Sequence, residues 1–224
     1  ELIDTHCHLT FEQLAWEIDE VVQRSIAAGV TGWITVGTDS QENRKAVEVA
    51  ERFENMYAAV GIHPHEAKGF TGETIAELKE LAGSEKVVAI GETGLDFHYN
   101  FSNESDQKRA FAAQLKIARE VNLPVIIHSR EAFDETIDIF HEYLKTNLSL
   151  PCKVTGIEDF RWEEIYVFGF GDQEEYEQLK KTQPSYTDCY ELLGIDRKRK
   201  SEWMLFWEDD IGANVRRISD GKEF

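Results

Sequence analysis

The sequence predicts an α/β protein with a parallel sheet, followed by a small α+β module, and three observations lead to this fold class. Residues 2–146 alternate short apolar runs, rich in Val and Ile, with segments of helical periodicity. Strands joined by helices of this length form right-handed βαβ units and therefore a parallel sheet. Several of the apolar runs end at a His or a Glu. After Pro151 the alternation stops and aromatic runs separated by turn residues take its place.

The first part contains five strand-helix pairs. The expected strands are Leu2–Leu9, Trp33–Val36, Tyr57–Ile62, Val87–Gly91 and Val125–His128. The expected helices are Phe11–Ala28, Glu42–Phe53 after an N-cap at Ser40, a helix from Thr71 or Thr74 to about Ala82, Asp106–Val121 after Ser105, and Ala132–Leu144. Gly29 ends the first helix, and Asn122 and Pro124 end the fourth.

The last part, residues 157–224, is expected to form an antiparallel sheet with a short helix near Tyr176 and Leu179. The expected strands are Lys153–Thr155, Trp162–Phe170, Tyr190–Leu193, Trp203–Trp207 and Asn214–Ile218. We expect the side chains of Tyr166, Phe168, Leu205 and Phe206 to contribute to the packing of this module.

Composition excludes several classes of protein. The 224 residues are 42% hydrophobic, which is typical of a globular chain that buries a core. No apolar run approaches the roughly 20 residues of a membrane span, so we expect no membrane association. The three cysteines, Cys7, Cys152 and Cys189, are too few and too scattered for a disulfide scaffold. They favour a reducing compartment, and we expect the cytoplasm.

The net charge of -19 is spread along the chain. Residues 1–156 hold 26 acidic and 14 basic side chains, a net charge of -12, and residues 157–224 hold 17 and 10, a net charge of -7. Non-specific binding to duplex nucleic acid depends on Lys and Arg at the phosphates, so tight duplex binding is disfavoured. A small phosphate substrate held through metal ions remains compatible with this charge.

Metal-type side chains recur where the predicted strands end. They are His6 and His8 in LIDTHCHL, His63 and His65 in GIHPHE, Glu92 in AIGETGLDF and His128 in LPVIIHSR. In parallel α/β proteins, ligands and catalytic groups collect at the carboxyl ends of the strands. Imidazole and carboxylate are natural ligands of divalent ions. These motifs therefore predict a metal site at that edge of the sheet.

Each motif also has a purely structural interpretation. Glu92 could be buried against an Arg, and His128 alone would be a hydrogen-bonded core histidine. The turn formed by His63 and His65 could only shape a loop. The coincidence of all the motifs favours metal binding. For Asp96, support of a ligand and capping of a turn are left equally open.

The motifs LIDTHCHL, GIHPHE, GETGLDFHYNFS and LPVIIHSREAFDET resemble those of the TatD-type metal-dependent deoxyribonucleases of the amidohydrolase superfamily, over residues 2–150. The resemblance implies a TIM-like (β/α) barrel and hydrolysis of phosphodiester bonds with one or two divalent ions, which could be magnesium, manganese or zinc. It implies that His6 and His8 bind one ion, that Glu92 bridges or binds at the site, and that His128 binds the second ion. Glu92 and His128 are then the catalytic pair.

The same resemblance implies a substrate site. His63 and His65 would line the phosphate pocket, with Arg130 as a helper. The substrate would be the ends or single strands of nucleic acid.

The chain also departs from this family. The family continues with a histidine on a sixth strand and an aspartate on an eighth, whereas Cys152 stands at the first of these places and no His follows His141. A complete barrel needs about 250 residues. We therefore expect an incomplete barrel of about five βα units and weak activity.

Two other functions remain open from the sequence. One is a non-catalytic barrel fragment fused to an interaction module, with residues 157–224 contacting a protein partner. The other is a hydrolase of the same superfamily with a non-nucleic substrate.

The change of sequence texture predicts two domains, residues 1–151 and residues 157–224. Because an exposed linker is cleaved before a packed domain, we expect limited proteolysis to cut first between Leu148 and Asp159. Mass spectrometry of the early fragments would locate the cut. First cleavage inside residues 30–130 would contradict this boundary.

Overall fold

The computed structural model describes residues 2–155, 162–167, 169, 171–200 and 209–224. The chain forms two compact units, Glu1–Thr136 and Ile137–Phe224. The division falls inside helix α6 (Phe133–Asn147), which contributes residues to both units. The domain boundary predicted near residues 151–157 stays a prediction. Among the described residues, no helix is both long and apolar enough to span a lipid bilayer.

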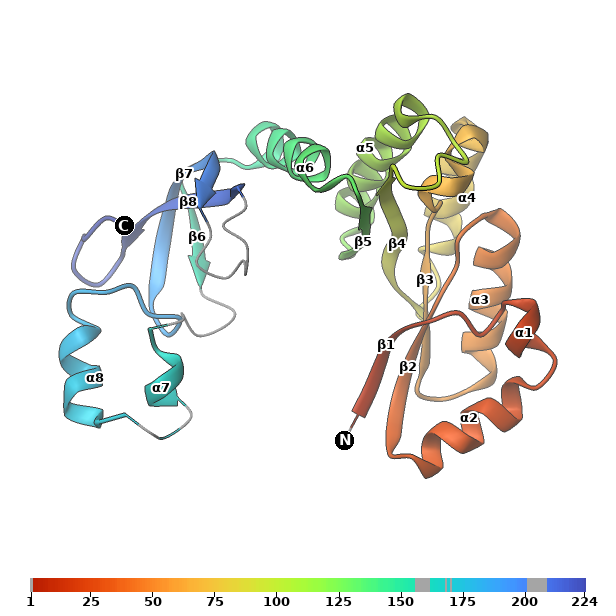
Figure 1. The fold of residues 1–224 in the computed structure, drawn as a ribbon, viewed down its shortest axis with the longest axis horizontal. Helices are drawn as coiled ribbons and strands as arrows, with labels where there is room; N and C mark the ends of the chain where they lie inside the picture. The colour runs from red at the N-terminus through yellow and green to blue at the C-terminus, as the bar shows by residue number, and fades with distance from the viewer. Residues whose placement is uncertain (1, 156–161, 168, 170, 201–208) are drawn as a thin grey trace. The chain divides into compact units, whose positions relative to one another are not determined.

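The first unit is a parallel sheet with the strand order β1-β2-β3-β4-β5 (Figure 1). The strands are β1 (Leu2–Cys7), β2 (Val30–Val36), β3 (Met56–Val60), β4 (Val87–Asp96) and β5 (Val125–Arg130). The intervening helices are α1 (Glu12–Ala15), α2 (Ile18–Ala27), α3 (Ser40–Arg52), the 3₁₀ helix η1 (Pro64–Gly69), α4 (Gly72–Leu81) and α5 (Glu104–Val121). Each expected strand is present, so the predicted βαβ succession is confirmed.

The helix boundaries differ from prediction where polar side chains near the boundary cap the helix. Asp39, rather than Ser40, caps α3, and its carboxylate accepts the N–H groups of Gln41 and Glu42. Asn103 caps α5 two residues earlier than expected. The predicted helix Phe11–Ala28 is divided into α1 and α2, with Trp16 and Glu17 between them.

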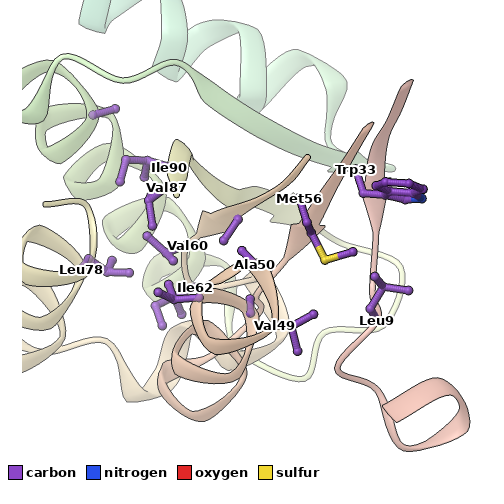
Figure 2. Close-up of a cluster of buried hydrophobic side chains, with 14 of the residues drawn as sticks. Leu9, Trp33, Val49, Ala50, Met56, Val60, Ile62, Leu78, Val87 and Ile90 are labelled. Atoms are coloured by element: carbon purple, nitrogen blue, oxygen red, sulfur yellow. The ribbon is translucent and has the colours of Figure 1, made fainter. Parts of the chain in front are cut away.

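The main core lies between the sheet and helices α2 to α5 (Figure 2). Trp33, Met56 and Ile90 of the strands pack with Ala50 of α3 and Leu78 of α4. Burial of each large apolar side chain, such as Leu, Ile or Met, stabilises the fold by about 1.5–3 kcal/mol. A smaller buried cluster of different strand residues, Val36, Ala59 and Ala89, is separate from this core, and Ile34 and Ile126 pack against it. Because side chains alternate between the two faces of a strand, the two clusters belong to opposite faces of the sheet.

Three buried amide side chains bind backbone at or just beyond the strand ends. Asn43 of α3 accepts the N–H of Gly61 at 3.0 Å and donates to its carbonyl at 2.9 Å. Gln114 of α5 does the same for Ile62, at 2.7 and 3.1 Å. Gln107, also of α5, pairs with the N–H and carbonyl of Asp96, at 2.7 and 3.0 Å. We call these three residues the amide clamps. They satisfy backbone groups that burial would otherwise leave without partners.

The second unit contains an antiparallel sheet, as predicted, and its strand order is β6-β7-β8. Its elements are β6 (Cys152–Thr155), α7 (Glu164–Val167), α8 (Gln173–Leu179), β7 (Cys189–Lys200) and β8 (Asp209–Arg217). The predicted strand Trp203–Trp207 and the packing residues Phe168, Leu205 and Phe206 lie outside the described residues. The module is therefore an α+β module, as expected.

The strand predicted at Trp162–Phe170 is wrong, because residues 164–167 form helix α7. Trp162 and Tyr166 are four residues apart, and their rings cluster with Tyr176 of α8. The buried Glu163 accepts hydrogen bonds from the Tyr176 hydroxyl at 2.9 Å and from Ser185 Oγ at 2.7 Å. This polar anchor and the aromatic contacts stabilise the helical turn against the strand propensity of the aromatic residues.

The amide clamps generate a stability prediction. Gln114→Ala should lower the free energy of unfolding by about 1–3 kcal/mol or more, since it leaves buried backbone groups of Ile62 without partners. Urea denaturation, followed through the helical signal, would measure the change. The matched control is Gln23→Ala, at an exposed helical position of α2, which should change stability by no more than about 0.5 kcal/mol. Equal effects of the two substitutions would contradict the role of the clamp.

Candidate metal centre

The carboxyl ends of four strands bring the predicted site residues together. His6 lies on β1 and His8 follows it, His63 caps η1 after β3, Glu92 lies on β4, and His128 lies on β5. Because the strands are parallel and adjacent, these ends meet at one edge of the sheet. The six residues predicted at strand ends, His65 included, form one connected set of contacts.

The carboxylate of Glu92 lies between two groups of imidazoles. Its Oε2 lies 3.3 Å from His6 Nε2 and 3.8 Å from His8 Nε2. Its Oε1 lies 2.9 Å from His128 Nδ1, which is 3.3 Å from His63 Nε2. The two oxygens thus face different groups, and within each group the ligand atoms lie within 4.8 Å of one another.

Glycine is required beside this carboxylate. Gly91 has a φ of +148°, and a Cβ atom there would lie 2.6 Å from the carbonyl oxygen of Ile126 on β5. A Cβ atom on Gly61 would lie 2.6 Å from the Cα of Gly91. The absence of side chains at both positions lets the strands approach closely where Glu92 enters the site.

Hydrogen bonds determine the tautomers of two histidines. His8 Nδ1 lies 3.0 Å from the carbonyl oxygen of Val36, so it carries a proton and leaves the Nε2 lone pair free toward Glu92. His63 Nδ1 instead accepts the N–H of His65 at 3.2 Å, so neutral His63 carries its proton on Nε2. His8 is therefore prepared to bind a cation, whereas His63 is prepared to donate a hydrogen bond.

Asp96, at the end of β4, is the fully buried hub of the centre. Its Oδ2 lies 3.0 Å from both His65 Nε2 and His128 Nε2, and its Oδ1 accepts the N–H groups of His98 and Tyr99, each at 3.1 Å. Burial raises the pKa of Asp96, but these hydrogen bonds outweigh it and hold the pKa at about 2. Asp96 is thus an anion that orients two imidazoles.

The other charges of the centre follow from burial and contact. Burial raises the pKa of Glu92. Its hydrogen bond with His128 and its attraction to the neighbouring imidazoles have the larger combined effect and lower the pKa to about 2. Burial lowers the pKa of His63 to about 4, although Glu92 acts in the opposite direction. The hydrogen bond with Glu92 raises the pKa of His128, against the effect of burial. The contact between Glu92 and His128 therefore favours the charged form of each group.

The donor atoms fit a divalent metal ion. Two nitrogens at about 2.0–2.1 Å from one tetrahedral ion lie about 3.3–3.4 Å apart. His6 Nε2 and His8 Nε2 are 3.3 Å apart, with Glu92 Oε2 beside both. At the other oxygen of Glu92, His63 and His128 complete a second group of possible ligand atoms.

A pocket of about 280 Å³ opens beside this centre. It is lined by His8, Phe11, Thr38, Asp39, His63, His65, Glu66 and Glu92. The ring of Phe11 stacks on His8, with 4.5 Å between centroids. The predicted helper Arg130 lies at the end of β5, with Nη1 3.9 Å from Asp96 Oδ2.

Sequence reasoning missed part of this arrangement. The sequence leaves Asp96 open between support of a ligand and capping of a turn. In the structure Asp96 contacts two imidazoles and also accepts two backbone N–H groups of its turn. The amide clamps were not anticipated, although Gln107 and Gln114 are seven residues apart on the buried face of α5. A polar residue on an apolar helical face is the signal that identifies such a clamp.

The parallel sheet and its polar carboxyl edge define the first unit as part of a (β/α) barrel. The family model described as TatD related DNase matches residues 3–157, and the chain belongs to this family. The predicted fold, an incomplete barrel of five βα units with an α+β module, is confirmed.

Named relatives agree with this family. The chain is 44% identical over 141 residues to "Uncharacterized metal-dependent hydrolase YabD" of Bacillus subtilis, covering 63% of this chain and 55% of the relative. It is 40% identical over 144 residues to "3'-5' ssDNA/RNA exonuclease TatD" of Escherichia fergusonii, covering 64% and 55%. The chain thus spans about half the length of the curated relatives that it matches.

Solved structures show the same architecture. The crystal structure of YJJV, a TatD homologue from Escherichia coli K12, matches with a TM-score of 0.58 and 32% identity, over 61% of this chain and 54% of that one. An uncharacterized amidohydrolase from Saccharomyces cerevisiae matches with a TM-score of 0.58 and 19% identity, over 84% and 58%, which supports the fold alone.

The role of Asp96 as a positioning residue can be tested. Asp96→Asn should weaken the binding of zinc or manganese roughly 10–100-fold, since Asn keeps only one acceptor oxygen, and its NH₂ group would face either the two imidazoles or the N–H groups of His98 and Tyr99. Isothermal titration calorimetry of the folded variants would measure this. Asp19→Asn, at an exposed position of α2, is the control and should bind like the unmodified chain. Unchanged affinity in Asp96→Asn would show that the imidazoles are oriented by other contacts.

Proposed function

We propose that the chain is a metal-dependent hydrolase of phosphodiester bonds that acts on single-stranded nucleic acid. The observation that carries the proposal is the Glu92 carboxylate, whose two oxygens face separate groups of histidines. The names of the relatives, a metal-dependent hydrolase and an exonuclease of single-stranded DNA and RNA, support it.

In this proposal His6, His8 and Glu92 hold one divalent ion, and Glu92 and His128 hold a second. Bound ions supply a nucleophile by lowering the pKa of water, and they neutralise charge on the reacting phosphate. Three imidazoles around one carboxylate favour zinc over magnesium, because magnesium prefers oxygen ligands. Asp96 keeps His128 in its orientation from the opposite side.

His63 and His65 line the pocket and bind the phosphate there. His63 is neutral and carries its proton on Nε2, so it can donate a hydrogen bond to a phosphate oxygen. His65 is held by Asp96 at the wall of the pocket. Arg130 brings a positive charge to the same edge. We keep Glu92 and His128 as the residues on which the reaction depends.

Charge limits the substrates that we expect. A net charge of -12 over residues 1–156 disfavours long contacts with a phosphate backbone, so short single strands or strand ends are the expected substrates. In the resemblance, Cys152 also stands at the place of a metal-binding histidine. We therefore expect slow hydrolysis. The three cysteines are free, which fits the cytoplasm as the compartment in this proposal.

The proposal predicts metal binding that depends on the histidines. The intact chain should bind at least one divalent ion, and the double variant His6→Ala, His8→Ala should lose the ion held at Glu92 Oε2. Calorimetry with zinc, manganese and magnesium, together with elemental analysis, measures this. A chain that binds none of the three ions would overturn the assignment.

The proposal also predicts an activity that depends on Glu92. Cleavage of short single-stranded DNA should require the metal, stop with chelator, and fall roughly 100-fold or more in Glu92→Gln. Glu85→Gln, at an exposed position, is the matched control and should cleave normally. Cleavage unaffected by Glu92→Gln would point to a contaminating nuclease.

A further inference from the structure

Two aromatic rings remain exposed beside the candidate metal centre. Tyr99 and Phe101 lie in the loop between β4 and α5, and they are 49% and 59% exposed. Their rings are parallel within 1°, with 5.6 Å between centroids. Exposed flat rings in one orientation present an apolar surface suited to a planar ligand. We call this pair the aromatic platform.

The platform is held in place from both ends of its loop. The N–H of Tyr99 donates to Asp96 Oδ1 at 3.1 Å. At the other end, the buried Ser102 donates its hydroxyl to the carbonyl of His65 at 2.7 Å and accepts the N–H of Lys68 at 3.0 Å. The rings are therefore positioned before any ligand arrives, which reduces the entropy cost of binding.

The platform also touches the metal centre directly. The His65 ring lies edge-on to Phe101 and Tyr99, with centroids 4.8 and 5.6 Å apart. His65 lines the pocket and bonds to Asp96. The guanidinium of Arg130 lies 5.3 Å from the centroid of Tyr99. In a nucleotide, one sugar separates base from phosphate. A phosphate at the pocket would therefore bring its neighbouring base to the platform.

The charge of the first unit strengthens this interpretation. A surface with excess negative charge gains little from the phosphate backbone, whereas stacking of a base on an aromatic ring does not depend on surface charge. We propose that Tyr99 and Phe101 stack a nucleobase next to the phosphate held at the metal centre, with Arg130 flanking the stack. This proposal rests on the proposed function, because it takes single-stranded nucleic acid as the ligand.

Binding tests the platform separately from catalysis. The probe is a short single-stranded oligonucleotide with phosphorothioate linkages and one 2-aminopurine base, mixed with the full chain and zinc. The fluorescence of 2-aminopurine falls when the base stacks, so the unmodified chain should quench it. Tyr99→Ala and Phe101→Ala should each weaken binding roughly 5-fold or more and reduce the quenching.

Matched variants separate ring stacking from general damage. Tyr99→Phe and Phe101→Tyr keep both rings and should bind within about 2-fold of the unmodified chain. Trp16→Ala removes a ring that is 76% exposed at the C-cap of α1 and should leave binding unchanged. Equal binding by the alanine variants and the unmodified chain, or no quenching by the unmodified chain, would overturn the proposal.

An abasic oligonucleotide completes the test. When the base beside the phosphate is missing, the alanine substitutions should not weaken binding further, because the rings then have no base to stack on. If the alanine substitutions weaken binding of the abasic and the complete oligonucleotide equally, the stacking proposal is wrong. If the chain quenches 2-aminopurine through these rings but hydrolyses no phosphodiester, the proposed hydrolase activity fails and the platform stands. If the chain hydrolyses phosphodiesters and the alanine variants bind as tightly as the unmodified chain, the hydrolase activity stands and the platform fails.

Discussion

Buried backbone at the carboxyl edge of a parallel sheet needs hydrogen-bond partners, and the geometry of the candidate centre depends on how this chain supplies them. Each amide clamp pairs with both the N–H and the carbonyl of one residue, as a neighbouring strand would. Gly61 and Ile62 immediately precede His63, and Asp96 is itself clamped. Helices α3 and α5 thereby fix the backbone from which the polar side chains project.

Two carboxylates divide the work of the centre between them. Glu92 is buried but faces the imidazoles that can bind a cation, whereas Asp96 lies behind His65 and His128 and holds them from the other side. Both carboxylates have a pKa of about 2, so two negative charges persist among the histidines. Such a concentration of charge in a partly buried place is stabilised by protons on imidazoles or by a metal ion.

The sequence was informative where a residue's role follows from its position on one element. Strand-end histidines and Glu92 could be identified because period-two alternation and parallel topology determine where they meet. The backbone partners of the clamps and the hub role of Asp96 could not, since each depends on a contact with another element of the fold. In the second unit, the aromatic residues of Trp162–Phe170 were assigned to a strand. The contacts of Glu163 with Tyr176 and Ser185, which no local pattern reveals, favour a helical turn instead.

The position of β1 in the sheet has a consequence for local opening. Within the described residues β1 pairs only with β2, and Leu2 and Ile3 are exposed, yet this edge strand carries His6. An edge strand with few buried contacts opens at a lower free energy than the central strands do. A ligand that contacts His6 binds only when β1 is paired with β2. Its binding free energy therefore stabilises the paired strand against local opening. Amide hydrogen exchange along residues 2–7 would then depend on the concentration of that ligand, while exchange in β3 would not.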